Sequence, residues 1–153
     1  MIGWTGIADR SRVVALIEEF NAGAPGFADL PPVEGAVEAV KNLSRAGFEL
    51  VVLTSCSDAP ETRRLRTGNL ERVFGAGTFS DIVCLALDRP KIDVLRTLPR
   101  ALFVDDLPKN VEAGLAAGHD AHLMMSSHNE EMIRAGAGGL PWIAGWGDLG
   151  LGT

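Results

Sequence analysis

Polar side chains that could handle a phosphoryl group follow apolar segments of this sequence. Thr54 and Ser55 come after "FELVVL", and the acid pair Asp105 and Asp106 comes after "ALFV". Between them, Lys91 opens the helix-like stretch "KIDVLRTL". Hydroxyl and ammonium groups donate hydrogen bonds to phosphate oxygens, and carboxylates are ligands that Mg²⁺ prefers. The residue types therefore predict a site for phosphate and magnesium.

Each of these residues also has an ordinary structural explanation. A hydroxyl after a strand is often only a cap, and an isolated lysine such as Lys91 is usually a solvated surface group. Asp106 could simply cap the helix that follows it. The site hypothesis rests on the occurrence of all these residue types at successive strand ends.

The apolar pattern alternates between helical and strand-like segments. Apolar residues from position 33 to position 43 form one stripe of a helix, which Gly47 ends. A later helix is expected to have Asp58 as its N-cap and Pro60 in its first turn, with Gly68 weakening its continuity. The expected helices are 13–20, 33–46, 57–74, 91–98 and 107–118, and the expected strands are 48–54, 82–87, 101–104 and 121–125.

Strands that are apolar on both faces and alternate with helices are typical of a parallel sheet covered on both sides. We therefore expect an α/β fold, a three-layer sandwich with a mainly parallel, Rossmann-like sheet. The buried strand cores should be 51–53, 83–85 and 102–104. Ligands of such sheets bind at the carboxyl ends of the strands, where Thr54 and Asp105 are expected to lie.

Composition and charge narrow the function classes. The 153 residues, 46% of them hydrophobic, suit one domain with a single core, and we expect 1–153 to be that domain. The net charge of −6, without a Lys/Arg cluster, argues against nucleic acid and membrane surfaces as partners. Two cysteines are too few for a disulfide scaffold, and we see neither a signal peptide nor an apolar run of about 20 residues. We expect a cytoplasmic protein.

The segment 126–153 differs from the middle of the chain. It is rich in glycine and contains Trp142 and Trp146. We expect its glycine-rich end to be an irregular arm that docks through its tryptophans. A contact between subunits, as in a homodimer, is the alternative.

Between residues 33 and 125 the sequence resembles the haloacid dehalogenase (HAD) superfamily of phosphohydrolases. "VVLTS" is similar to the second motif of that family, "RPKIDVL" to the third and "LFVDDLPKNVEAGLAAG" to the fourth. "ETRRLRTGNLERVFG" resembles the helix after motif two in members with little or no cap. The resemblance implies a HAD-like domain that uses Mg²⁺ to hydrolyse a small phosphorylated molecule. It implies catalytic roles for Thr54, Lys91 and Asp105, substrate binding by Thr54, Ser55 and Lys91, and metal ligation by Asp105 and Asp106.

The first motif of the family is not reproduced. Family members open with an apolar strand ending in Asp-x-Asp, in which the first aspartate attacks phosphorus and the second is general acid and base. "MIGWTGIADRSR" aligns with this motif through Gly6, which puts Gly3 at the nucleophile position and Thr5 at the acid/base position. Glycine has no side chain and threonine is not an acid near neutral pH, so we expect a catalytically impaired chain.

Two alternatives stay open. In the first, the protein is an active Mg-dependent phosphomonoester hydrolase whose true first motif lies upstream of Met1. In the second, it is a non-catalytic interaction module on the same fold. Under the resemblance, 1–32 holds the degenerate first motif and a short cap-like insert. An insert of this size is too small for the cap domain that gives specificity, so substrate identity is not predicted.

Other phosphate and metal patterns fail on spacing or order. A Cys-x5-Arg loop starting at Cys56 would need arginine where Thr62 stands. A receiver domain carries its acid pair before the Thr and Lys, and no strand end shows Gly-x-Gly-x-x-Gly. The histidines do not have a recognisable metal-site spacing, so we expect surface or strand-edge roles for them. They are His119, His122 and His128.

Overall fold

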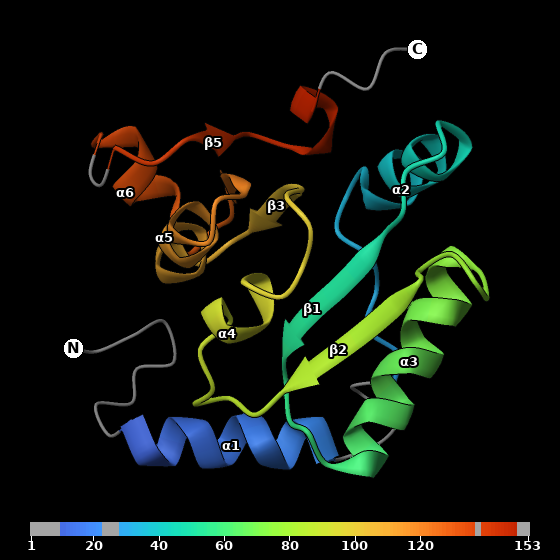
Figure 1. Ribbon diagram of the computed structural model, residues 1–153. Coiled ribbons are helices and arrows are strands. Elements are labelled where there is room, and N and C mark those ends of the chain that lie inside the picture. The colour runs from blue at the N-terminus through green and yellow to red at the C-terminus, as the bar shows by residue number, and fades with distance from the viewer. Residues whose placement is uncertain (1–9, 23–27, 137–138, 150–153) are drawn as a thin grey trace. The chain divides into compact units, whose positions relative to one another are not determined.

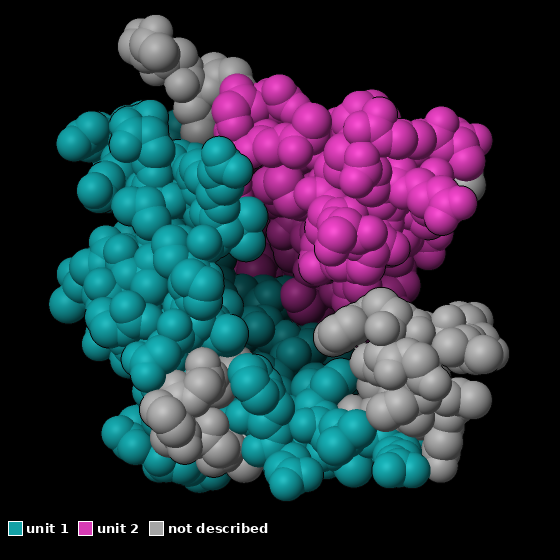
Figure 2. Space-filling model, turned by 180° about the vertical axis from the view of Figure 1, so that it is seen from behind, with its two compact units in different colours: residues 1–89 teal, residues 90–153 magenta. Residues whose placement is uncertain are grey.

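The computed structural model describes residues 10–22, 28–136 and 139–149 (Figure 1). The chain divides into two compact units, residues 1–89 and residues 90–153 (Figure 2). Each unit combines helices with parallel strands, so the predicted α/β class is confirmed. Within the described residues, no helix has both the length and the apolar character needed to cross a bilayer.

The first unit contains a two-stranded parallel sheet and three helices. Val51 lies opposite Asp81, and Ser55 lies opposite Leu85. The helix α3 packs against this sheet through Leu65, which is buried in one cluster with Cys84 of the second strand (Figure 1). The elements are α1 (Arg10–Ala22), α2 (Ala36–Arg45), β1 (Val51–Ser55), α3 (Pro60–Phe74) and β2 (Asp81–Leu85).

The start of α3 follows the predicted proline but not the predicted cap. Pro60 occupies the first turn, where its missing N–H costs nothing. The N-cap is Ala59 rather than Asp58, and its side chain makes no cap hydrogen bond. The Ser57 hydroxyl accepts a hydrogen bond from the Ala59 N–H at 3.1 Å, which orders the turn before the helix. Gly68 does not interrupt the helix.

The core of the first unit is smaller than the expected strand cores suggest. Its buried cluster is Cys56, Leu65 and Cys84, with Ala28, Leu30 and Ile82 packed against it. Val51 is 39% exposed, and in the second unit Leu102 is 44% exposed. Both residues begin their strands, where fewer neighbours cover a side chain. The predicted burial of 51–53, 83–85 and 102–104 is therefore only partly confirmed. Cys84 and Leu85 are buried, the first residues Val51 and Leu102 are exposed, and the other five residues are half-buried.

The second unit contains a three-stranded parallel sheet in the order β3-β4-β5. Leu102 lies opposite Asp120, and Leu123 lies opposite Trp142. The helix α5 contacts both β3 and β4 (Figure 1). The elements are α4 (Ile92–Leu95), β3 (Leu102–Asp105), α5 (Pro108–Ala116), β4 (Asp120–Met124), α6 (Glu130–Arg134), β5 (Trp142–Ile143) and the 3-10 helix η1 (Trp146–Leu149).

The end of the chain corrects the prediction of an irregular arm docked by tryptophans. Trp142 and Ile143 form β5, and backbone hydrogen bonds tie this segment to β4. The Leu123 N–H donates to the Pro141 carbonyl at 2.8 Å, and the Met125 N–H donates to the Ile143 carbonyl at 2.9 Å. Ile143 is buried, whereas Trp142 is 50% exposed. Strand pairing and Ile143 therefore hold residues 142–143, where the Trp142 side chain is half-exposed. Trp146 of η1 is half-buried and its Nε1 is covered.

The core of the second unit brings α5 close to the sheet. Val111, Ala121, Leu123 and Ile133 form its buried cluster. A Cβ atom added at Gly114 of α5 would lie 2.7 Å from Phe103 Cδ1 and 2.9 Å from Ala121 Cβ. Only glycine permits this approach of helix to strands. The contact holds the last turns of α5 against the first halves of β3 and β4.

Candidate functional site

The turn between β3 and α5 is built around the carboxylate of Asp105. Asp105 is the last residue of β3, and Pro108 begins α5 two residues after Asp106. Asp105 Oδ1 accepts a hydrogen bond from the Leu107 N–H at 2.9 Å and another from Asn110 Nδ2 at 2.9 Å. Asp105, not Asp106, therefore orders the helix start, and the expectation that Asp106 could cap this helix is wrong.

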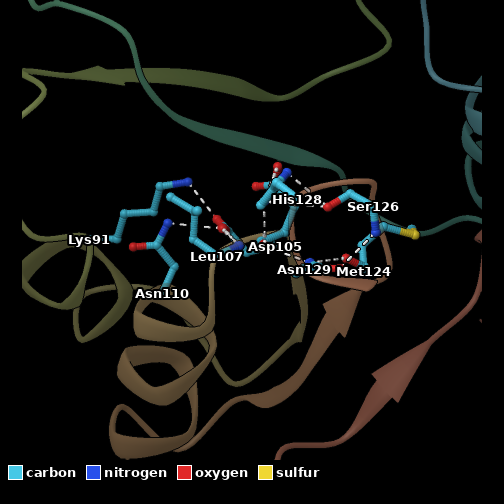
Figure 3. A network of polar contacts seen from close by, with 9 residues as sticks. Lys91, Asp105, Leu107, Asn110, Met124, Ser126, His128 and Asn129 are labelled. Atoms are coloured by element: carbon cyan, nitrogen blue, oxygen red, sulfur yellow. Dashed lines mark hydrogen bonds and ion pairs between the residues drawn. The ribbon is translucent and has the colours of Figure 1, made fainter. Parts of the chain in front are cut away.

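Lys91 and Asp105 form a buried ion pair at the carboxyl end of β3. The distance from Lys91 Nζ to Asp105 Oδ2 is 2.7 Å, and the two side chains are only 8% and 6% exposed. Figure 3 shows Lys91 and Asn110 both directed at Asp105. The predicted meeting of these two charges is confirmed, and Lys91 is not the solvated surface lysine of the ordinary explanation.

Buried His119 connects the short helix after Lys91 to the strand that ends in Asp105. The Ala101 N–H donates to His119 Nδ1 at 3.2 Å, and His119 Nε2 lies 2.8 Å from the Leu95 carbonyl. Because Nδ1 accepts, the proton sits on Nε2, which donates to Leu95. His119 is only 6% exposed, so the expected surface or strand-edge role is wrong. Its hydrogen bonds link the end of α4 to the start of β3.

Asp106 presents its carboxylate outward beside the buried pair. Its side chain is 55% exposed, and Oδ2 lies 3.5 Å from His128 Nε2. Asn129 holds the Asp106 carbonyl through a hydrogen bond from Nδ2 at 2.8 Å. The same amide group donates to the Met124 carbonyl at 2.9 Å, while its Oδ1 accepts from the Ser126 N–H at 2.8 Å. Asn129 thus joins the loop after β3 to the loop after β4 (Figure 3).

Asn110 and Asn129 are site residues that the sequence analysis missed. Asn110 is the third residue of α5, a position from which side chains return to the residues before a helix, so its spacing from Asp105 was a usable signal. Asn129 stands before α6 and is only 3% exposed. Asparagine before a helix predicts a cap, and nothing in the sequence indicates that it instead reaches the Asp106 carbonyl.

Thr54 and Ser55 lie at the carboxyl end of β1, as predicted, and both are half-buried. They belong to the unit of residues 1–89, whereas Lys91 and the acid pair belong to the unit of residues 90–153. That the hydroxyl groups and Lys91 share one ligand stays a prediction. Gly3 and Thr5, at the expected first-motif positions, lie outside the described residues.

The two cysteines form part of the first unit's core. Both thiols are free and buried. Burial is the main cause that raises the pKa of Cys84 to about 11, and the charge of Cys56 and a hydrogen bond with it add to the effect. Cys84 in β2 and Cys56 in the loop after β1 are both buried core residues.

The arrangement in the second unit combines one buried cation with one exposed carboxylate. Among residues 10–22, 28–136 and 139–149, no three His, Cys, Asp or Glu side chains gather around one metal position. Asp105 already accepts from three donors, so Asp106 is the carboxylate with more capacity for a cation. A cation at Asp106 would take further ligands from neighbouring polar atoms, from water or from a bound anion.

Neither a scan against protein-family models nor a search of curated proteins gives a match for this chain. The geometry of the site and the motif resemblance are therefore the two grounds for assigning a function to this chain.

Proposed function

We propose that this chain is a HAD-like phosphohydrolase-fold protein that binds phosphate or a small phosphorylated molecule with Mg²⁺ at the carboxyl end of β3, and that its catalysis is impaired. The supporting observation is the buried pair of Lys91 and Asp105 at that strand end. Burying two charges costs several kcal/mol per ion before their attraction is counted. The Lys91–Asp105 pair lies at the carboxyl end of a strand, where parallel sheets bind ligands. This position favours a role in function as the reason why the two charges are buried.

The proposed roles follow from burial and from the hydrogen bonds already made. Lys91 supplies the positive charge that attracts a phosphoryl group, and Asp105 orients its ammonium group. Asp106, with its exposed carboxylate, is the main metal ligand, and Asp105 contributes its remaining lone pair. Phosphate binding by Thr54 and Ser55 is what the motif resemblance implies, and it stays a prediction. Bound Mg²⁺ supplies charge neutralisation at the phosphate oxygens.

Impaired turnover is part of the proposal because of Gly3 and Thr5. At the family's nucleophile and acid/base positions this sequence has no carboxylate. Lys91 and the acid pair can position a phosphate, which is the electrostatic part of phosphoryl transfer. Neither residue type at positions 3 and 5 provides the in-line nucleophile or the proton donor that the chemistry also needs.

We also propose that the protein is cytoplasmic and that it does not bind nucleic acid. A homodimer contact is one way in which an open site could be covered. The free thiols of Cys56 and Cys84 fit a reducing compartment. The net charge of −6 disfavours binding to nucleic acid phosphates.

Binding of inorganic phosphate to the full chain, with and without Mg²⁺, tests the proposal. Isothermal titration calorimetry should detect phosphate binding that Mg²⁺ strengthens. The variant Asp106→Asn should weaken this magnesium effect by roughly tenfold or more, because it removes the main metal ligand. The matched control is Asp120→Asn, which alters another exposed aspartate that contacts a histidine. Absence of phosphate binding in the unmodified chain, or equal losses in both variants, would show the proposal to be wrong.

A further inference from the structure

Three electron-rich atoms converge where the loop after β3 meets the loop after β4. His128 Nε2 lies 3.1 Å from the Asp106 carbonyl oxygen and 3.5 Å from Asp106 Oδ2. A neutral imidazole nitrogen with its lone pair directed at two oxygens is unfavourable unless a proton or a cation lies between them. The convergence therefore has two stable states, one with a proton on Nε2 and one with a cation held by the same atoms.

Ser126 provides the partner that the cation-bound state needs. Its hydroxyl oxygen lies 3.0 Å from His128 Nδ1 and 3.4 Å from Nε2 (Figure 3). When Nδ1–H donates to this hydroxyl, the lone pair of Nε2 is left for a metal. Histidines that ligate metals usually donate their other ring N–H to an oxygen, which fixes the tautomer and orients the ring. The hydroxyl can also donate to Nδ1, so the proton-bound state is satisfied as well.

The backbone around these atoms is held by buried hydrogen bonds. Asn129 binds the Asp106 carbonyl, the Met124 carbonyl and the Ser126 N–H at once, and it is 3% exposed. The two loops that carry Asp106 and His128 are thereby tied to each other within one unit. The ligand atoms are brought together before any cation binds, which reduces the ordering cost of binding.

We propose that Asp106 and His128 form a site for a divalent transition-metal ion of the Co²⁺, Ni²⁺ and Zn²⁺ class, with water or phosphate oxygens completing the coordination. The inference rests on the proposed function, since it assigns a nitrogen ligand to the metal position at Asp106. Bonds of about 2.0–2.2 Å to His and Asp at a tetrahedral angle place the two ligand atoms about 3.4 Å apart. The observed 3.5 Å matches this spacing. Imidazole favours these borderline metals, whereas Mg²⁺ favours oxygen alone.

A second pair in the same unit supplies a matched control. His122 Nε2 lies 3.0 Å from Asp120 Oδ1, near the start of β4 rather than at its carboxyl end. Within the described part of the chain this pair shows no carbonyl or serine contact like those of His128. It has the same residue types without the converging carbonyl oxygen or the serine partner.

Co²⁺ titration of the full-length protein, read by visible absorption and by imidazole NMR signals, tests the inference. We expect saturable Co²⁺ binding that shifts the His128 signals. His128→Gln should weaken Co²⁺ and Zn²⁺ binding by roughly tenfold or more and leave Mg²⁺ affinity unchanged. His122→Gln should leave both unchanged. Circular dichroism checks that each variant is folded.

Three results would overturn the inference: no saturable Co²⁺ binding, equal effects of the two histidine variants, or Mg²⁺ affinity falling with His128→Gln as much as Co²⁺ affinity does.

The readout of this test is separate from the test of the proposed function. If phosphate fails to bind with Mg²⁺ while Co²⁺ binds through His128, the phosphate function is wrong and the metal site stands. If phosphate binds with Mg²⁺ but His128→Gln leaves Co²⁺ affinity unchanged, the metal-site inference is wrong alone.

Discussion

The buried charges of Lys91 and Asp105 are expected to be strongly coupled. Removing one of them, in Lys91→Met or Asp105→Asn, leaves the other charge buried without its counter-ion, at a cost of roughly 3–5 kcal/mol. The double variant removes both charges, so its loss in free energy of unfolding should be clearly smaller than the sum of the single losses. Urea denaturation of the four proteins measures this coupling. Additive losses would contradict a direct interaction between the two side chains.

The thiol of Cys84 should make stability depend on alkaline pH. Burial is the main cause that raises the pKa of Cys84 from 9.0 to about 11 in the folded chain. The charge of Cys56 and a hydrogen bond with Cys56 raise it further. Between these values the unfolded chain loses a proton that the folded chain keeps. The stabilising contribution is thus complete below about pH 9 and is lost as the pH rises towards 11.

Substitution of Cys84 tests this dependence. In Cys84→Ala the free energy of unfolding should fall less steeply with pH over the same window than in the unmodified chain. Denaturant titrations at several pH values give the two slopes. The comparison uses slopes because the substitution also removes buried contacts. Equal slopes would mean that this thiol does not ionise on unfolding in that range.

The charged residues of the candidate site could be predicted from the sequence better than the hydrogen bonds that hold its loops in place. Lys91 before a helix and Asp105 after an apolar strand have residue types that suit phosphate and metal binding, and this local pattern was enough to single them out. The structure pairs them although β2 and β3 belong to different sheets. The choice between Asp105 and Asp106 as the residue that orders the helix start was not predictable, because adjacent aspartates have the same local preferences. The contact of Asn129 with Asp106 depends on how two loops meet, which no short pattern encodes.

The α-helices α3 and α5 each contain a glycine, and the structure gives opposite expectations for replacing these two residues with alanine. Around Gly68 of α3 an added Cβ meets nothing within 4 Å, so Gly68→Ala should stabilise the protein by roughly 0.5–1 kcal/mol. At Gly114 of α5 the Cβ would lie 2.7 Å from Phe103, so Gly114→Ala should destabilise it by about 1–3 kcal/mol. Thermal or denaturant unfolding measures both. Stabilisation by Gly114→Ala would contradict the close packing of α5 on the sheet.

Among helices and strands, the segments with a clear apolar pattern were predicted, including the short helix α4, whereas α6, β5 and η1 were not. The helices α2, α3 and α5 and the four longer strands lie within a few residues of their expected positions. The two-residue strand β5 has no pattern of its own, because its existence depends on the edge of β4 that it pairs with. The observed strand ends differ from the expected ones by up to a few residues, as in β1, which begins at the exposed residue Val51 rather than at residue 48.

For the whole protein, the proposed impairment predicts no phosphatase turnover above background. Purified protein with Mg²⁺ and a generic phosphomonoester should release no more phosphate than a blank, because positions 3 and 5 carry no acid. Restoring a single acid should achieve little, since residues that act as a unit are strongly non-additive. The double variant Gly3→Asp with Thr5→Asp should hydrolyse the substrate measurably and only with Mg²⁺. Clear turnover by the unmodified chain would contradict the impairment.

The pairing of β5 with β4 determines when the sheet of the second unit can close during synthesis. The strand β4 and the helix α6 leave the ribosome before residues 142 and 143 have been added. Until then the backbone groups of Leu123 and Met125 that later bond to this segment have no partner on that side. An uncovered strand edge is a template for pairing with another chain. The addition of β5 therefore ends a period in which this edge of β4 is open to pairing with another chain.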